Sequence, residues 1–210
     1  MEDTDSDAYA LTVVSDMQHW LERAVIGLQL CPFAKAVHVR GQIHYHVSRA
    51  TEPDRLLEEL EHAMLELAGL DAMKRDTTLL IMPDALRSFL EFNDFLHRAD
   101  ALLEALELDG ELQVASFHPR FQFAGTTPDD IGNATNRAPY PTLHLLREAS
   151  MDRAVAAFPQ AESIFETNID TLRQLGRDGW DALGIKRTAP VAQGQTAPTH
   201  QAGKRRGRMR

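Results

Sequence analysis

The sequence predicts an α/β fold, arranged as a two-layer or three-layer sandwich around a sheet of about four strands. Two observations lead to this prediction. Segments with the spacing of amphipathic helices alternate with short strand-like segments, and no internal repeat interrupts the alternation. This pattern favours a mostly parallel sheet or a ferredoxin-like mixed one. We expect a single globular domain over residues 1–185 and a disordered basic tail over residues 186–210.

Four elements are expected in the first half of the chain. Apolar residues at every third or fourth position predict helices, alternation predicts a half-buried strand, and a continuous apolar run predicts a central strand. Pro32 ends the first helix, and Pro53 lies in the first turn of the second. The first helix is expected to bury Leu11, Val14, Met17, Leu21, Ala24 and Leu28. The elements are a helix over residues 8–30, a strand over 42–48, a helix over 51–67 and a strand over 77–83.

The second half of the chain continues the alternation. Segment 142–147 has two interpretations, because its pattern suits a fourth strand while Pro141 suits the start of a helix. Ser150 is expected to cap a short helix that ends before Pro159. The other expected elements are a helix over 88–108, a strand over 112–117 and a helix over 161–175.

Composition limits the classes of function. No apolar run approaches the roughly 20 residues that span a bilayer, and the acidic first ten residues do not resemble a signal or transit peptide. Cys31 is the only cysteine, which excludes an internal disulfide and indicates a reducing, cytoplasmic location. We expect it to be a buried structural thiol, because it follows a helix rather than preceding one.

The net charge of −9 is unevenly distributed, since residues 186–210 contain seven basic residues and no acidic one. An acidic body is a poor surface for nucleic acid, so contact with RNA or anionic lipid is expected only through the tail. The common signatures of phosphate loops, dinucleotide-binding turns, hydrolase elbows and zinc proteases are absent from the sequence.

The loop over residues 118–141 carries the candidate site. Connections of this length are uncommon in compact domains unless they are functional or disordered, and its aromatic residues argue against disorder. The loop follows an expected strand, where open α/β sheets place their ligands. Arginine forks match carboxylate or phosphate, and histidine titrates near neutrality. The candidate catalytic residues are His118, Asp129 and Asp130, and the candidate substrate-binding residues are Arg120, Asn133, Asn136, Arg137, His144 and Arg147.

Each candidate also has a structural interpretation. Arg120 can bind loop carbonyls, the aspartates can cap a turn, the asparagines can form an Asx-turn network, and His144 can be a hydrogen-bonded core residue. The sequence does not decide between these interpretations.

Three hypotheses of function follow. The first is an enzyme that acts on a small anionic metabolite bearing phosphate or carboxylate, with no cofactor or reaction type indicated. The second is a non-catalytic binding or assembly protein whose ordered loop forms a partner surface. The third is a metal-binding protein that uses His44 and His46 with His118 or His144. The oligomeric state cannot be predicted from the sequence.

Several motifs resemble those of an uncharacterised bacterial family, domain of unknown function 1415. The similarity covers nearly all of residues 8–176, and it implies a soluble bacterial protein that consists essentially of this domain. It implies no activity, substrate or catalytic residue, and the basic tail is an extra feature of this chain. The motifs are LCPFA (30–34), FHPRFQFAGT (117–126), NATNRAPYPTLHLLREAS (133–150) and ETNIDTLRQLG (166–176).

Overall fold

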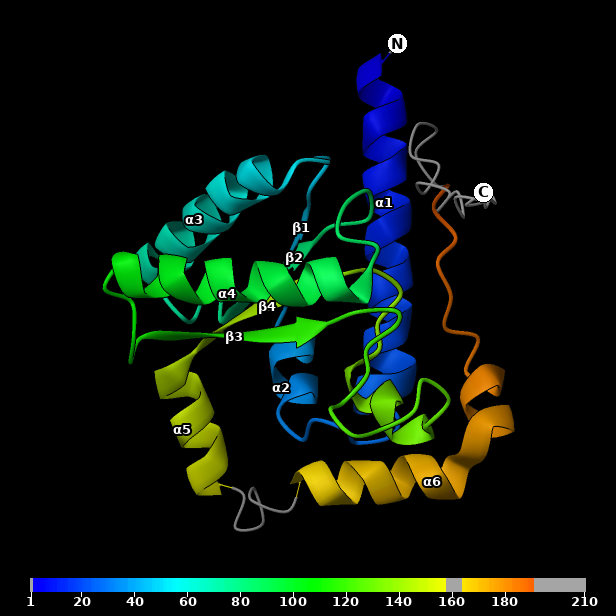
Figure 1. Cartoon of the computed structure of the whole chain (residues 1–210). Helices are drawn as coiled ribbons and strands as arrows, with labels where there is room; N and C mark the ends of the chain where they lie inside the picture. The colour runs from blue at the N-terminus through cyan, green and yellow to red at the C-terminus, as the bar shows by residue number, and fades with distance from the viewer. Residues whose placement is uncertain (1, 158–163, 191–210) are drawn as a thin grey trace, which may run out of the picture.

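The computed structural model describes residues 2–157 and 164–190 of the chain. Within these residues, helices surround one four-stranded sheet (Figure 1), which confirms the predicted α/β class. The strands are β1 (Ile43–Val47), β2 (Thr77–Ile81), β3 (Leu112–Phe117) and β4 (Thr142–Arg147). The helices are α1 (Glu2–Trp20), the π-helix η1 (Leu21–Ile26), α2 (Ala34–Val39), α3 (Pro53–Gly69), α4 (Phe89–Ala105), the 3₁₀ helix η2 (Ile131–Asn136), α5 (Glu148–Ala157) and α6 (Ile164–Ala182).

The sheet is mixed and has the strand order β1-β2-β4-β3. β1 and β2 are parallel, while β4 lies between β2 and β3 and is antiparallel to both. The carboxyl ends of β1, β2 and β3 therefore lie at one edge, and the 118–141 loop leaves that edge and returns into β4. Segment 142–147 is thus a strand, because hydrogen bonds to two neighbours stabilise the extended backbone more than one isolated helical turn would.

Helices cover both faces of the sheet, so the sandwich has three layers. On one face, α3 and α4 bury a core that includes Leu60, Phe92 and Leu143. On the other face, α1, η1, η2 and α6 contribute to a second core, which includes Met17 and Tyr140. Because successive strand residues point to opposite faces, β2 supplies Leu80 to the first core and Leu79 and Ile81 to the second, while β4 supplies Leu143 and Leu145 to the first. None of the helices in the described ranges is long and apolar enough to cross a membrane.

The first helix buries part of the predicted face. Met17, Leu21 and Ala24 are buried as predicted, but Leu11 is 70% exposed, and Val13 and Trp20, which were not predicted, are at most 3% exposed. After Trp20 the helix widens into the π-helix η1, which changes the direction of the side chains that follow. Gly27 is needed just after η1, because a Cβ at this position would lie 2.5 Å from the carbonyl oxygen of Arg23.

Three further local features differ from the predictions. The helix α2 over residues 34–39 was not expected, because its sequence has no clear amphipathic pattern. α5 begins at Glu148, so Ser150 lies inside its first turn and is not the N-cap. α6 continues beyond residue 175 through a kink at Gly176, where φ is +68°.

The region predicted as a tail begins with an ordered segment. Residues 186–190 pack near α1, with Ala189 only 4% exposed, and residues 191–210 lie outside the described residues.

Candidate functional site

The 118–141 loop is held in place by a row of aromatic rings. Phe89 of α4 lies 5.2 Å from Phe121 between ring centroids, Phe121 lies 4.9 Å from Phe123, and Phe123 lies 5.3 Å from Phe165 of α6. These contacts join the loop to helices from opposite faces of the sheet. The loop is therefore ordered, as its aromatic content predicts.

His118 lies at the end of β3 and is completely buried. Its Nε2–H donates to the carbonyl oxygen of Leu86 over 3.1 Å, and its Nδ1 accepts from the backbone N–H of Arg120 over 3.0 Å. Burial lowers the pKa of His118 to about 4, so the imidazole is neutral at pH 7. Both ring nitrogens form hydrogen bonds to the backbone, which favours a structural role. The bond to Leu86 stabilises a residue whose φ is +49°.

The loop arginines donate to backbone carbonyl oxygens. Arg120 donates to the carbonyl of Arg87 in the segment that follows β2. Arg137 donates to the carbonyls of Phe121 over 3.2 Å and Pro128 over 2.7 Å. In the described structure the two guanidinium groups therefore bind backbone carbonyl oxygens.

The loop asparagines also stabilise the loop itself. Asn133 is fully buried, and its Oδ1 accepts from the N–H of Phe123 while its Nδ2 donates to the carbonyl of Thr127. Asn136 donates to the carbonyl of Ser116 over 3.2 Å. The asparagines thus have a structural role, but they are not the predicted Asx turns, because an Asx turn bonds the backbone two residues on and these bonds span 6 to 20 residues.

The two aspartates point to different environments. Asp130 caps η2, because its Oδ1 accepts from the N–H of Gly132 over 2.8 Å. Asp129 is exposed and lies 3.3 Å from the guanidinium of Arg177 on α6. The predicted loop residues therefore belong to several separate hydrogen-bond networks in the described structure.

Arg147, the last residue of β4, binds the end of α3. Its Nη2 donates to the carbonyls of Leu67 over 2.5 Å and Leu70 over 2.6 Å, and its Nε lies 3.3 Å from the carbonyl of Arg75. A cation at a helix C-terminus satisfies carbonyls that lack intrahelical partners and interacts favourably with the helix dipole. The geometry therefore gives Arg147 the role of a helix cap.

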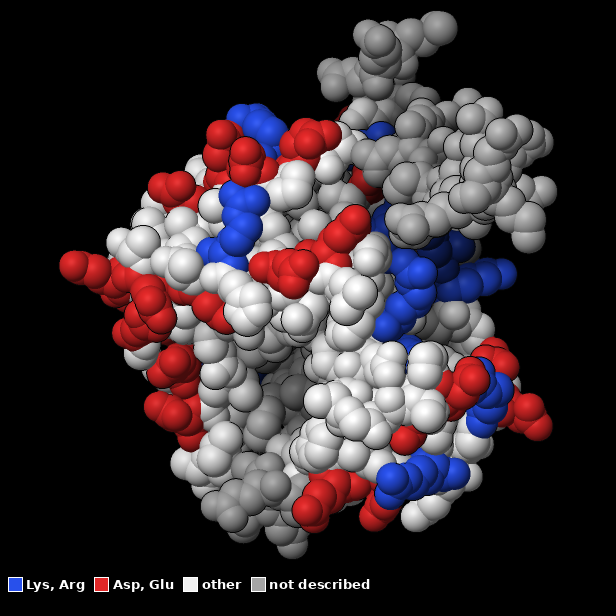
Figure 2. Space-filling view, in the orientation of Figure 1, with Lys and Arg blue, Asp and Glu red and all other residues white. Residues whose placement is uncertain are grey.

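A cavity of about 440 Å³ lies against the sheet, between η1, α2 and α5. Figure 2 shows a hollow in this face of the molecule, in the region between α5 and the loop in Figure 1. We call this space the His144 cavity, after the imidazole at its sheet wall. Its apolar walls include Trp20, Leu21, Val25, Phe33, Val37, Ile43, Leu79, Phe117, Leu146 and Met151.

His144 projects from the central strand β4, opposite Leu79 and Ala115 in register. Its ring contacts that of Phe117, with centroids 6.2 Å apart, and no side chain or backbone group among the described residues forms a hydrogen bond with the imidazole. Burial lowers the pKa of His144 to about 4. The cavity wall therefore carries a neutral imidazole, with one donor and one acceptor nitrogen available.

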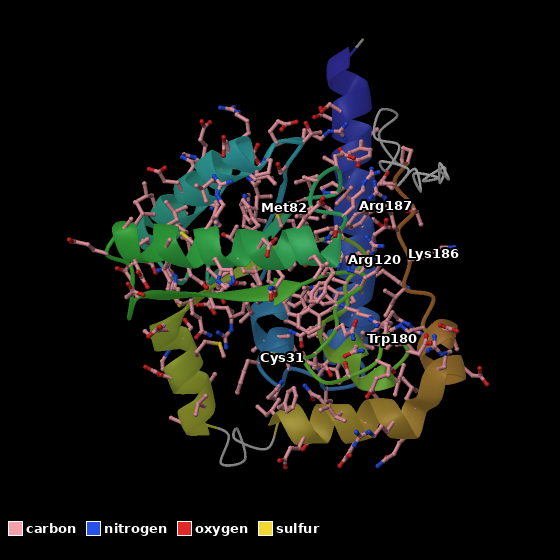
Figure 3. All side chains as sticks on the ribbon, viewed as in Figure 1. Cys31, Met82, Arg120, Trp180, Lys186 and Arg187 are labelled. Atoms are coloured by element: carbon pink, nitrogen blue, oxygen red, sulfur yellow. The ribbon has the colours of Figure 1, made fainter. Side chains whose placement is uncertain are left out.

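Other polar groups of the cavity lie near α5. Ser150 donates to Asp76 over 2.5 Å, and Arg153 donates to Ser150 over 2.9 Å. Cys31 lines the wall beside α2 (Figure 3), and burial raises the pKa of its thiol, which remains protonated at neutral pH. Cys31 was predicted to be buried, but it is only half-buried and faces the cavity.

The histidines considered for metal binding do not come together with further ligands. His44 and His46 lie on the α3 side of β1 with ring centroids 6.3 Å apart, and His46 lies 3.3 Å from Glu59. Within residues 2–157 and 164–190, no three histidine, cysteine, aspartate or glutamate side chains are grouped to hold a metal ion.

Comparison with known families gives one match. The family model described as a protein of unknown function, DUF1415, matches residues 12–182. The chain belongs to the DUF1415 family. The match includes every strand, the 118–141 loop and the His144 cavity, and it ends before the ordered segment 186–190. No curated protein and no solved structure matches the chain.

Sequence reasoning missed most of the cavity of this DUF1415 protein. Its walls come from residues 20–37, from all four strands and from α5, so no local motif contains it. Of the nine predicted site residues, only His144 and Arg147 line it. The available signal was a polar residue between leucines on a central strand, where an apolar side chain is usual.

Proposed function

We propose that this protein binds a small, largely apolar molecule that carries one hydrogen-bonding group, and that the His144 cavity is the binding site. The observation that carries the proposal is the neutral imidazole of His144 on an apolar wall, which has no hydrogen-bond partner among the residues that the structure describes. The volume of about 440 Å³ lies within the usual range of roughly 300–1,000 Å³ for small-molecule sites. Predominantly apolar walls with a few placed polar groups are also typical of such sites.

The character of the cavity favours a hydroxyl or carbonyl group on the ligand. Of the three arginines that line the cavity, Arg147 is bonded to the carbonyls of α3, and Arg40 and Arg153 are exposed, so none is placed to pair with an anion buried beside the neutral His144. A charge without a partner would lose its hydration on entering an apolar site. We therefore replace a small anionic metabolite at the 118–141 loop, the first sequence hypothesis, with an uncharged ligand in the cavity.

We limit the proposal to binding. The thiol of Cys31 is protonated at neutral pH, and the carboxylate of Asp76 accepts from Ser150. Neither group is prepared to act as a nucleophile or a general base.

The location is tested with N-phenyl-1-naphthylamine, an uncharged dye whose fluorescence rises in apolar sites. We expect saturable binding to the full-length chain and its loss in Ala154→Trp, because Ala154 lines the cavity and the indole would fill it. Ala156→Trp is the matched control on the exposed side of the same helix and is expected to bind like wild type. Unchanged binding in Ala154→Trp would place the dye elsewhere.

The role of His144 is tested by comparing 1-naphthol with naphthalene as competitors of the dye. One hydrogen bond to His144 should favour 1-naphthol by roughly tenfold in the wild-type chain. His144→Leu keeps an apolar side chain at this position and should remove that preference while retaining dye binding. An equal preference in both proteins would contradict the role given to His144.

A further inference from the structure

The ordered segment 186–190 lies on a polar surface that the function proposed above does not use. After α6 the chain turns at Gly184 and runs beside α1 (Figure 1). The surface that it covers consists of Tyr9, Asp16, Pro83, Asp84 and Tyr140, and we call it the Asp16–Asp84 surface.

Arg187 is bound by several groups of this surface. Its Nη1 donates to the carbonyl of Pro83 over 2.7 Å, and its guanidinium lies 3.8 Å from the carboxylate of Asp84. The same guanidinium lies 5.1 Å from the ring centroid of Tyr140, a cation–π distance. Figure 3 shows Arg187 where the segment passes α1.

Thr188 and Ala189 are bound through side-chain and backbone groups. The N–H of Thr188 donates to Oδ2 of Asp16 over 2.7 Å, and its hydroxyl donates to Oδ1 over 2.6 Å. The N–H of Ala189 donates to the hydroxyl of Tyr140 over 3.2 Å, and Tyr140 donates in turn to Asp16. Three consecutive residues therefore contact the surface: Arg187 through its guanidinium, Thr188 through its N–H and hydroxyl, and Ala189 through its N–H.

The segment supplies hydrogen bonds to one buried carboxylate of this surface and a cation to the other. Asp16 is 9% exposed and Asp84 is 3% exposed, and buried carboxylates are costly unless they are paired. Without the segment, Asp16 would keep the hydrogen bond from Tyr140 as its only contact among the described side chains. Asp84 would keep the hydrogen bond from Tyr9 at 2.9 Å and an ion pair with Arg49 at 3.6 Å, so Arg187 is a second cation at this carboxylate.

We propose that the Asp16–Asp84 surface is a recognition site for an extended peptide that presents an arginine followed by a threonine and a small residue. Residues 187–189 are its intramolecular occupant, and a peptide of the same chemistry displaces them. The site recognises the guanidinium at Asp84 and the threonine at Asp16. Tethering gives the intramolecular segment an effective concentration in the millimolar range, so it competes strongly with a separate peptide.

The test uses the full-length chain and a fluorescein-labelled peptide, Lys-Arg-Thr-Ala-Pro, which has the sequence of residues 186–190. In a variant with Arg187→Ala and Thr188→Ala, we expect saturable binding measured by fluorescence anisotropy. Binding to wild type should be at least tenfold weaker, because its own segment competes. The control peptide Lys-Ala-Thr-Ala-Pro should bind at least tenfold more weakly to the double variant.

Two results would overturn the proposal: no peptide binding to a double variant that melts cooperatively, or equal binding to the variant and to wild type. If the double variant does not fold, Thr188→Ala alone is measured, and it should bind the peptide more tightly than wild type does. If Thr188→Ala does not fold either, or binds no peptide, the segment is an integral part of the fold and is not displaceable.

Discussion

Lowering the pH is expected to destabilise this protein through His118 before its carboxylates are protonated. The native pKa of His118 is about 4, whereas an unfolded histidine titrates near 6.5. Between these values the unfolded chain binds a proton that the native protein does not bind, so stability falls as the pH falls. This difference in pKa contributes about 3 kcal/mol to the free energy of unfolding. The contribution is fully present above pH 6.5 and fully lost below pH 4.

The assay is urea unfolding, followed by circular dichroism at a series of pH values from 7.5 to 4.5. His118→Gln is the matched variant, because an amide N–H can still donate to the Leu86 carbonyl but does not titrate. Its stability should fall by about 2–3 kcal/mol less than that of wild type over this range. A native imidazole of His118 that titrates near pH 6.5 by NMR, or identical pH profiles for the two proteins, would refute the reasoning.

Three substitutions test other contacts by urea unfolding at pH 7.5. Arg147→Ala should cost about 3 kcal/mol, because the carbonyls at the end of α3 lose a charged donor, and Arg147→Lys should recover only part of it; an unchanged midpoint would return Arg147 to the list of free binding groups. Gly27→Ala should destabilise by more than 1 kcal/mol although alanine has the higher helix propensity, since the new Cβ would lie 2.5 Å from a carbonyl oxygen, and a gain in stability would contradict this geometry. Asn133→Ala should cost about 2–3 kcal/mol by leaving buried loop groups unpaired, and wild-type stability would mean that the loop does not depend on that amide.

The contacts of the loop residues also explain why residue type alone could not establish a site in the 118–141 loop. Arginine, asparagine and histidine are the residues expected both around a bound anion and inside an irregular loop, since both need donors and acceptors. Residue type therefore could not separate the two uses of Arg137 or Asn133. The backbone carbonyls that bind them belong to residues up to 16 positions away, and only the folded loop shows those partners.

The sequence by itself determined the fold class, three of the four strands and the order of the main helices, because apolar periodicity is a local property. It also predicted an ordered loop, since Phe121 and Phe123 are anchors that a solvated linker would lack. Only the tertiary structure decided that segment 142–147 pairs on both sides, that His118 is enclosed while His144 faces a cavity, and that Arg187 returns to α1. Each of these features depends on contacts between segments that are distant in the sequence. The energies of such contacts come from buried surface and hydrogen bonds between the segments, so no single segment of the chain predicts them.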